Sequence, residues 1–150
     1  MKPNNKIMKK ESSVIPKPLI DKWQKVVDSM AGIFDVHAGL ITRDASPYRE
    51  VLLTSSTPNN PYKIGRRDLA PGLYCEAVVK SRKELLVANA LKDLSWNRNP
   101  DIKLGMISYL GFPLLWPDGD VFGAICVLDS KENQYNTRYR DILQNFFGGE

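Results

Sequence analysis

The sequence has 150 residues, 43% of them hydrophobic, which is enough for one domain with a real core. Its net charge of +4 and pI of about 9.1 would fit nucleic acid or an acidic membrane surface as a partner. The whole excess lies in residues 1–22, where six lysines face only Glu11 and Asp21. Residues 23–150 carry 15 basic and 15 acidic side chains, so we expect no nucleic-acid partner for the folded part.

Composition excludes several other classes of protein. No run of about 18 apolar residues predicts a membrane span, and residues 1–13 lack the apolar centre of a secretory signal. Cys75 and Cys126 are far apart in sequence and suit a reducing cytosol, so we expect a cytoplasmic protein. A single histidine, His37, excludes a multi-histidine metal site within one chain.

The first half of the chain predicts a leader, a helix and a hairpin. Residues 1–15 are lysine-rich and polar, which predicts a disordered basic leader before a domain at 16–150. A helix is predicted from Pro16 to about Gly32. Strands are expected over 37–43 and 51–56, and a proline-rich loop over 57–72. The apolar stripe of the helix is Leu19, Trp23, Val26, Val27 and Met30.

The second half predicts a helix over 73–80, a buried strand over 85–88, and a short helix over 101–106. A hairpin follows, with strands over 107–116 and 121–129 joined by a Pro-Asp-Gly-Asp turn. The second strand is apolar on both faces, which predicts a central position in the sheet, with Phe122 and Cys126 on one face. A terminal helix carrying Tyr139, Ile142, Leu143 and Phe146 completes an α+β fold with mostly antiparallel pairing.

Three segments together resemble a GAF domain: residues 72–79 (GLYCEAVV), residues 85–91 (LLVANAL) and the hairpin 108–129 (SYLGFPLLWPDGDVFGAICVLD). The resemblance covers about residues 19–147 and is most similar to GAF domains of bacterial sensor histidine kinases and diguanylate cyclases. It implies a central antiparallel sheet with the terminal helices on one face and a ligand pocket on the other.

The same resemblance implies a regulatory sensory module that is not itself catalytic. An unidentified small molecule would bind in the pocket, and the terminal helices would relay the change to a homodimer partner and to a C-terminal output domain, a kinase or cyclase. No cofactor is identified. The residues that the resemblance places at the pocket are Tyr74, Cys75, Asn89, Trp96, Met106 and Tyr109.

The alternative for these residues is a purely structural role. Tyr74, Trp96 and Met106 would equally complete the core, and Cys126 in mid-strand would be a buried, inert thiol. The run Arg66-Arg67-Asp68 would either grip an anionic ligand or form a solvated charged surface. Two other functions share the fold: a thiol-dependent free methionine sulfoxide reductase, and a ligand-free dimerisation module.

Overall fold

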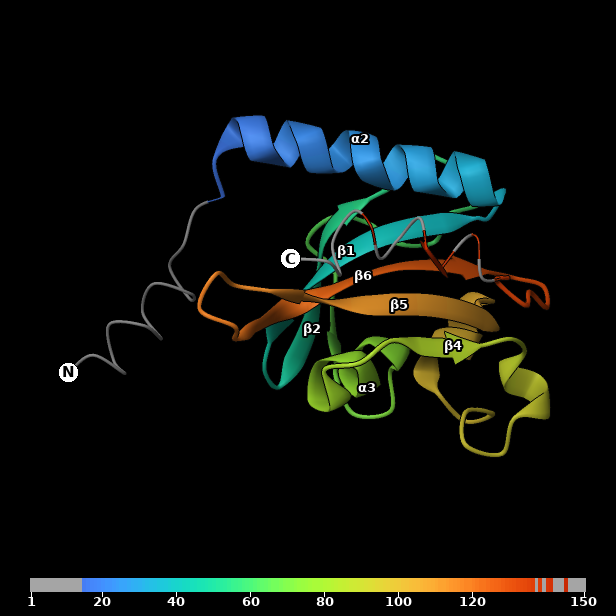
Figure 1. Cartoon of the computed structure of the whole chain (residues 1–150). Coiled ribbons are helices and arrows are strands. Elements are labelled where there is room, and N and C mark those ends of the chain that lie inside the picture. The colour runs from blue at the N-terminus through green and yellow to red at the C-terminus, as the bar shows by residue number, and fades with distance from the viewer. Residues whose placement is uncertain (1–14, 137, 139, 142–144, 146–150) are drawn as a thin grey trace.

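One antiparallel sheet of six strands organises the protein, in the order β3-β2-β1-β6-β5-β4 (Figure 1). The structure is a computed structural model that describes residues 15–136, 138, 140, 141 and 145. The strands are β1 (Ala38–Ala45), β2 (Tyr48–Thr54), β3 (Arg67–Leu69), β4 (Leu85–Val87), β5 (Ser108–Leu115) and β6 (Val121–Asp129). All neighbouring strands pair antiparallel, and β6 lies between β1 and β5. The predicted α+β fold and the central position of the last strand are confirmed.

Helix α2 (Lys17–Phe34) lies along one face of the sheet (Figure 1). Proline in its first turn removes no hydrogen bond, and the helix ends where Asp35 adopts a left-handed conformation at φ 55°. Its backbone comes very close to β1, because a Cβ placed on Gly39 would lie 2.8 Å from the Val27 carbonyl oxygen. This predicted helix is therefore confirmed, and a glycine sets its distance from the sheet.

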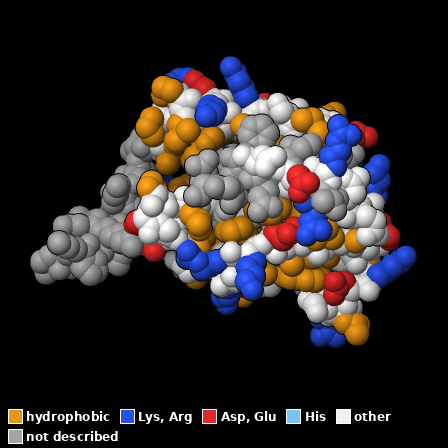
Figure 2. Space-filling model, in the orientation of Figure 1, with side chains coloured by type: hydrophobic (Ala, Val, Ile, Leu, Met, Phe, Trp, Pro, Cys, Tyr) orange, Lys and Arg blue, Asp and Glu red, His pale blue; other side chains and the backbone are white. Residues whose placement is uncertain are grey.

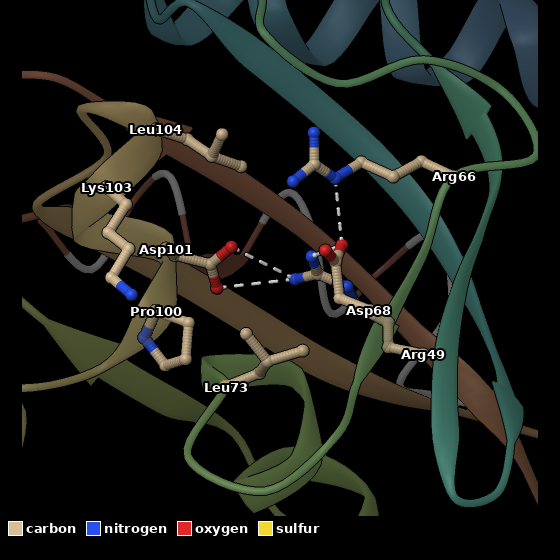
Figure 3. A pocket seen from close by; sticks show the side chains of 8 residues that line it. All are labelled: Arg49, Arg66, Asp68, Leu73, Pro100, Asp101, Lys103 and Leu104. Atoms are coloured by element: carbon tan, nitrogen blue, oxygen red, sulfur yellow. Dashed lines mark hydrogen bonds and ion pairs between the residues drawn. The ribbon is translucent and has the colours of Figure 1, made fainter.

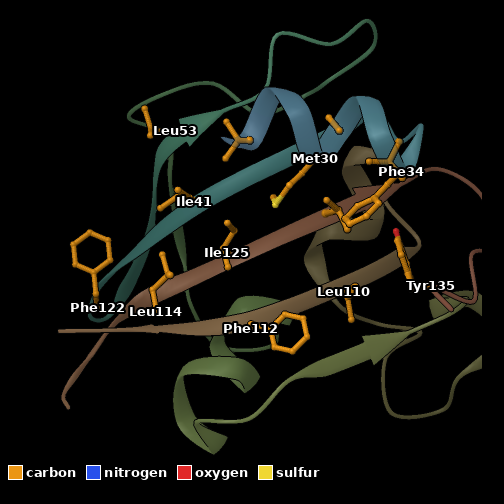
Figure 4. Packing of buried hydrophobic residues seen from close by; sticks show 14 residues of the cluster. Met30, Phe34, Ile41, Leu53, Leu110, Phe112, Leu114, Phe122, Ile125 and Tyr135 are labelled. Carbon is orange, nitrogen blue, oxygen red and sulfur yellow. The ribbon is translucent and has the colours of Figure 1, made fainter. Parts of the chain in front are cut away.

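The core under α2 is almost entirely aliphatic and aromatic (Figure 4). Phe122 belongs to this side, contrary to the prediction that places it on the face of Cys126. The β5–β6 register shifts between Leu114 and Leu115, so the strict alternation breaks at Phe122. The ring then packs edge-on against Trp23 and Trp116, with centroids 6.1 and 5.2 Å away.

The opposite face is covered by short elements from the middle of the chain. These are α3 (Tyr74–Ser81) and the 3₁₀ helices η1 (Ala90–Lys92) and η2 (Pro100–Leu104). They enclose a second buried cluster against the inward side chains of β1, β2 and β6, and this cluster contains three tyrosines and both cysteines. The two faces thus carry chemically different cores.

Two sequence predictions of connecting segments are corrected. The segment 57–72, expected to be loop throughout, contains the edge strand β3, which pairs with β2 over three residues. The first hairpin turn is also tighter than the predicted strands over 37–43 and 51–56 imply, since only Ser46 and Pro47 separate β1 from β2. A strand of three residues has too little pattern to be seen in a sequence, and its pairing with β2 is what defines it.

Parts of both ends lie outside the described residues. The predicted leader does so except for Ile15, which packs against the core under α2. Arg138, Arg140 and Asp141 are helical, and Arg140 pairs with Glu84 at 2.7 Å. The apolar positions of the predicted terminal helix, Tyr139, Ile142, Leu143 and Phe146, are among the residues not described.

The surface mixes both signs of charge. On the face drawn in Figure 2, Lys and Arg side chains are interspersed with Asp and Glu, and hydrophobic side chains gather near the N-terminal half of α2. This face therefore carries no extended patch of one sign, in keeping with the neutral balance of residues 23–150. No helix within the described residues is both long and apolar enough to cross a membrane.

Candidate ligand site on the face opposite the N-terminal helix

Arg49 is the centre of a buried ionic cluster at the start of β2. It lies two residues before Val51 and shares its inward face, which leaves the side chain only 4% exposed. Its Nη1 donates to both carboxylate oxygens of Asp101, at 3.2 and 3.3 Å, and its Nη2 donates to Asp68 Oδ2 at 2.7 Å (Figure 3). A strand position that alternation sends inward thus carries a cation between two carboxylates.

Asp101 is held firmly from several directions. It lies in the first turn of η2, where its backbone N–H donates to the capping Asn99 side chain at 2.9 Å. The Tyr62 hydroxyl donates to its Oδ1 at 2.9 Å, and the Tyr62 ring lies under the Arg49 guanidinium at 5.6 Å. With a side chain 1% exposed, Asp101 is the fixed counter-ion of Arg49.

Asp68 is the second carboxylate on Arg49, and it is held less firmly. It lies directly opposite Arg49 in the β2–β3 pairing, and its side chain is 24% exposed. Arg66 Nε donates to the same oxygen, Oδ2, at 2.9 Å. Partial burial alone would raise the pKa of Asp68, but the hydrogen bonds from Arg66 and Arg49 lower it below its ordinary value.

These charged side chains line a cavity of about 150 Å³ between β2, β3, the start of α3 and η2 (Figure 3). Its lining residues are Arg49, Arg66, Asp68, Leu73, Pro100, Asp101, Lys103 and Leu104. The apolar members form part of the wall, while the charged ones supply directional donors and acceptors. Small-molecule sites combine apolar walls with polar groups that orient the ligand, and here five of the eight lining residues are charged.

The electrostatics of the cluster favour a permanently charged Arg49. Burial works against the charge, but Cys75, Asp101, Tyr62 and the hydrogen bond with Asp68 together raise its pKa. Burial and the adjacent Asp101 raise the pKa of Tyr62, so Tyr62 remains a neutral donor. The arrangement can therefore bind and orient a ligand through charge. The described residues contain no group of three or more His, Cys, Asp or Glu side chains arranged to hold a metal ion.

Four of the six residues predicted from the sequence are packed together beside this cavity. Tyr74, Cys75, Met106 and Tyr109 are each at most 2% exposed. Tyr74 stacks on Tyr109 with centroids 4.8 Å apart, and Trp96 packs on Tyr74 at 5.4 Å. The Tyr74 hydroxyl donates to the Met106 carbonyl at 3.0 Å, which satisfies it inside the protein. These side chains pack against one another as one buried group, which we call the aromatic layer.

The two cysteines meet at the back of that layer. Cys75 on α3 and Cys126 on β6 are both buried, as the sequence predicts for Cys126. The Tyr109 hydroxyl lies 3.6 Å from Cys75 Sγ, and it reaches there over Gly111, where any Cβ would overlap the ring. A hydrogen bond with Cys126 and the charge of Arg49 lower the pKa of Cys75, whereas burial raises that of Cys126.

Asn89 has a local structural role. Its Oδ1 accepts from the Leu91 N–H at 3.0 Å and caps η1, and its Nδ2 donates to Glu132 Oε1 at 3.0 Å. None of the six predicted residues lines the cavity around Arg49. Their role in ligand binding stays a prediction.

The charged run Arg66-Arg67-Asp68 is predicted either to bind an anionic ligand or to form a solvated surface, and its residues divide between the two positions. Arg66 and Asp68 line the cavity, while Arg67 is 54% exposed and pairs with Glu50 on the outside at 3.4 Å. Sequence reasoning missed Arg49 and Asp101. The available signal was the alternation with Val51, which sends Arg49 inward and demands a carboxylate partner.

Comparisons with known proteins agree on the fold. A search of curated proteins finds no match. The blue-light-absorbing PixJ GAF domain of Thermosynechococcus elongatus is 14% identical and superposes with a TM-score of 0.71, covering 90% of this chain and 85% of that one. The GAF domain of an Acinetobacter phosphoenolpyruvate-protein phosphotransferase is 16% identical, with a TM-score of 0.66 and coverages of 93% and 82%.

A third solved structure, a type II free methionine-R-sulfoxide reductase from Thermoplasma acidophilum, is 9% identical with a TM-score of 0.64 and covers 84% of each chain. At such identities these structures establish the fold alone. The sequence model of one family, the GAF domain, matches residues 23–148, which is most of the chain. Its matched segment includes the sheet, the charged cavity and the aromatic layer described above. The chain therefore belongs to the GAF domain family.

Proposed function

We propose that this protein is a regulatory sensory module of a bacterial signal-transduction protein, which binds a small molecule in the Arg49 cavity and is not itself catalytic. The observation that carries the proposal is a buried cation that is fixed on one side by Asp101 and faces a cavity on the other. Desolvated charge is costly to maintain in a core, so its presence at a cavity favours a binding role over a purely structural one.

A route from the cavity to α2 supports the relay part of the proposal. Arg49 stands near the start of β2, and the end of the same strand is tied to α2. Gln24 Nε2 donates to the Thr54 carbonyl at 2.8 Å, and the Ser56 N–H donates to Asp28 Oδ1 at 2.8 Å. A ligand that shifts β2 would thus move its contacts with α2, provided that it binds the two arrangements with different affinity.

The proposal also includes the finer parts that the family resemblance implies. The terminal helices would pair with a second copy, and a C-terminal kinase or cyclase in the cytoplasm would read the change. Leu73 lines the cavity and directly precedes Tyr74 and Cys75. A ligand that displaced Leu73 would therefore reach the predicted residues of the aromatic layer.

Native mass spectrometry of freshly purified protein, followed by thermal shift across a metabolite panel, tests the proposal. We expect a bound small molecule or a stabilising metabolite. Leu104→Trp, which places bulk against the cavity, should abolish the shift, whereas Leu94→Trp at a site 92% exposed should leave it intact. An empty protein with no shift in any metabolite, or equal responses of the two variants, would contradict the proposal and favour a ligand-free dimerisation module.

The paired thiols favour one alternative, thiol-dependent reduction of free methionine sulfoxide. Cys75 and Cys126 lie together, although both are at most 2% exposed. The alternative requires sulfoxide reduction in the wild type that is lost when both residues are replaced by serine. Activity that survives in the double variant would exclude it.

A further inference from the structure

The cavity carries more positive than negative charge. Three of its lining residues are cations and two are carboxylates, and both carboxylates already pair with Arg49. Lys103 is exposed at the rim, and within the described residues its ammonium group has no hydrogen bond or ion pair. Added positive charge beside a cavity favours an anionic occupant.

The guanidinium of Arg49 is also incompletely used. Its Nη1 faces Asp101 and its Nη2 faces Asp68, but its Nε is buried and has no hydrogen-bond partner among the residues that the structure describes. A carboxylate bound across the Nε–Nη2 edge would accept two parallel hydrogen bonds, whereas Asp68 accepts one from Nη2. A bound carboxylate could therefore use the Nε donor of Arg49, which Asp68 and Asp101 leave unused.

The two carboxylates on Arg49 differ in how easily they could be replaced. Asp101 is almost fully buried and also accepts from Tyr62. Asp68 is partly exposed, lies on an edge strand of three residues, and receives both of its side-chain hydrogen bonds through the single oxygen Oδ2. Displacing Asp68 leaves it free to be hydrated, whereas displacing Asp101 would strand a buried charge.

We infer that the cavity binds a small carboxylate, and that Asp68 occupies the same donors of Arg49 and Arg66 as an internal competitor until the ligand replaces it. This inference rests on the proposed function and adds the chemical class of the ligand. A cavity of about 150 Å³ holds a molecule about the size of benzene, which matches a short-chain carboxylate. Replacement would also remove the side-chain ion pair that joins β3 to β2 at the register position where Asp68 lies opposite Arg49.

An NMR titration with sodium acetate at constant ionic strength tests the inference, using acetamide as the neutral molecule of equal size. The readout is the Nε–H resonance of Arg49 and Arg66 together with backbone amides of β2 and β3. Acetate should shift these signals and acetamide should not. If acetamide binds as tightly as acetate, the anion inference is overturned, while binding of some other molecule in the metabolite panel would leave the proposed function standing.

Two variants test the competitor role directly. Asp68→Asn keeps an acceptor but removes the competing charge, so acetate should bind roughly fivefold more tightly. Arg66→Gln removes a donor and should weaken acetate binding, while Arg67→Gln, next in sequence and outside the cavity, should leave it unchanged. Acetate affinity that is unchanged or lower in Asp68→Asn would overturn the competitor role.

Discussion

The two faces of the sheet are built on opposite principles. Under α2, the core is aliphatic and aromatic, and its buried Tyr135 hydroxyl is satisfied by Ser108 at 3.0 Å. On the other face, Arg49 and Asp101 are buried next to tyrosines and thiols. The first face needs only volume and shape to be stable, whereas the second depends on each charge keeping its partner.

This difference indicates where the protein can respond to a ligand. A close-packed apolar layer has one good arrangement and transmits movement as a unit. A charged cluster with an exchangeable member, the role inferred for Asp68, would have two arrangements that differ in which carboxylate occupies Arg49. The apolar face is therefore suited to relay and the polar face to binding. Each of the following substitutions changes one face and leaves the other intact.

The largest effect is expected from Asp101→Ala. This change leaves Arg49 buried without its fixed counter-ion, and breaking a buried pair typically costs about 3–5 kcal/mol. The measurement is urea unfolding at neutral pH. We expect the double variant Arg49→Met/Asp101→Leu to recover most of that loss, because it removes both charges. A loss below about 1 kcal/mol in the single variant would show that the pair is not effectively desolvated.

On the apolar face, Gly39→Ala should be the damaging change. The added Cβ would lie 2.8 Å from the Val27 carbonyl oxygen, so α2 has to move, at a cost of about 1–3 kcal/mol. Gly32→Ala is the matched control in α2, where nothing lies within 4 Å and alanine should stabilise the helix by about 0.5–1 kcal/mol. Calorimetric melting of both variants separates the two effects. Equal and small shifts would contradict the close approach of α2 and β1.

The sequence predicts the apolar face better than the polar one. Helical spacing and a turn with a defined mechanism are local signals, so α2 and the 107–129 hairpin are predicted close to their observed bounds. Arg49 and Asp101 are 52 positions apart, and only the folded chain brings them together. The predicted sheet face of Phe122 is wrong for a related reason, because its position depends on a register shift between β6 and β5.

The pH dependence of stability tests the exchangeable carboxylate. The folded-state pKa of Asp68 is lowered by its hydrogen bonds with Arg66 and Arg49. The carboxylate therefore makes its full contribution to stability above the unfolded-state pKa of about 3.9. That contribution is lost as the pH falls through the lower folded-state pKa. At neutral pH we expect the free energy of unfolding of the wild type to exceed that of Asp68→Asn by about 1 kcal/mol. Urea unfolding at a series of pH values should show this difference disappear in acid. A difference that stays constant with pH would contradict the assignment of the lowered pKa to Asp68. The pKa of Glu50 is also lowered, but Glu50 is present in both proteins, so its contribution cancels in the comparison.

The smallest effect is expected from Arg67→Ala, on the same short strand as Asp68. Arg67 is 54% exposed, and its partner Glu50 keeps a shorter ion pair with Arg43 at 2.9 Å. An exposed pair of this kind contributes about 0.5 kcal/mol or less, and urea unfolding should show no more than that. Because neighbouring charges on one strand would then differ at least about twofold in their effect on stability, the result would locate the energetic importance of β3 in its contact with Arg49. A loss of about 3 kcal/mol or more, the size typical of breaking a buried pair, would instead show that the whole charged edge is structural, and the contrast between the faces would weaken.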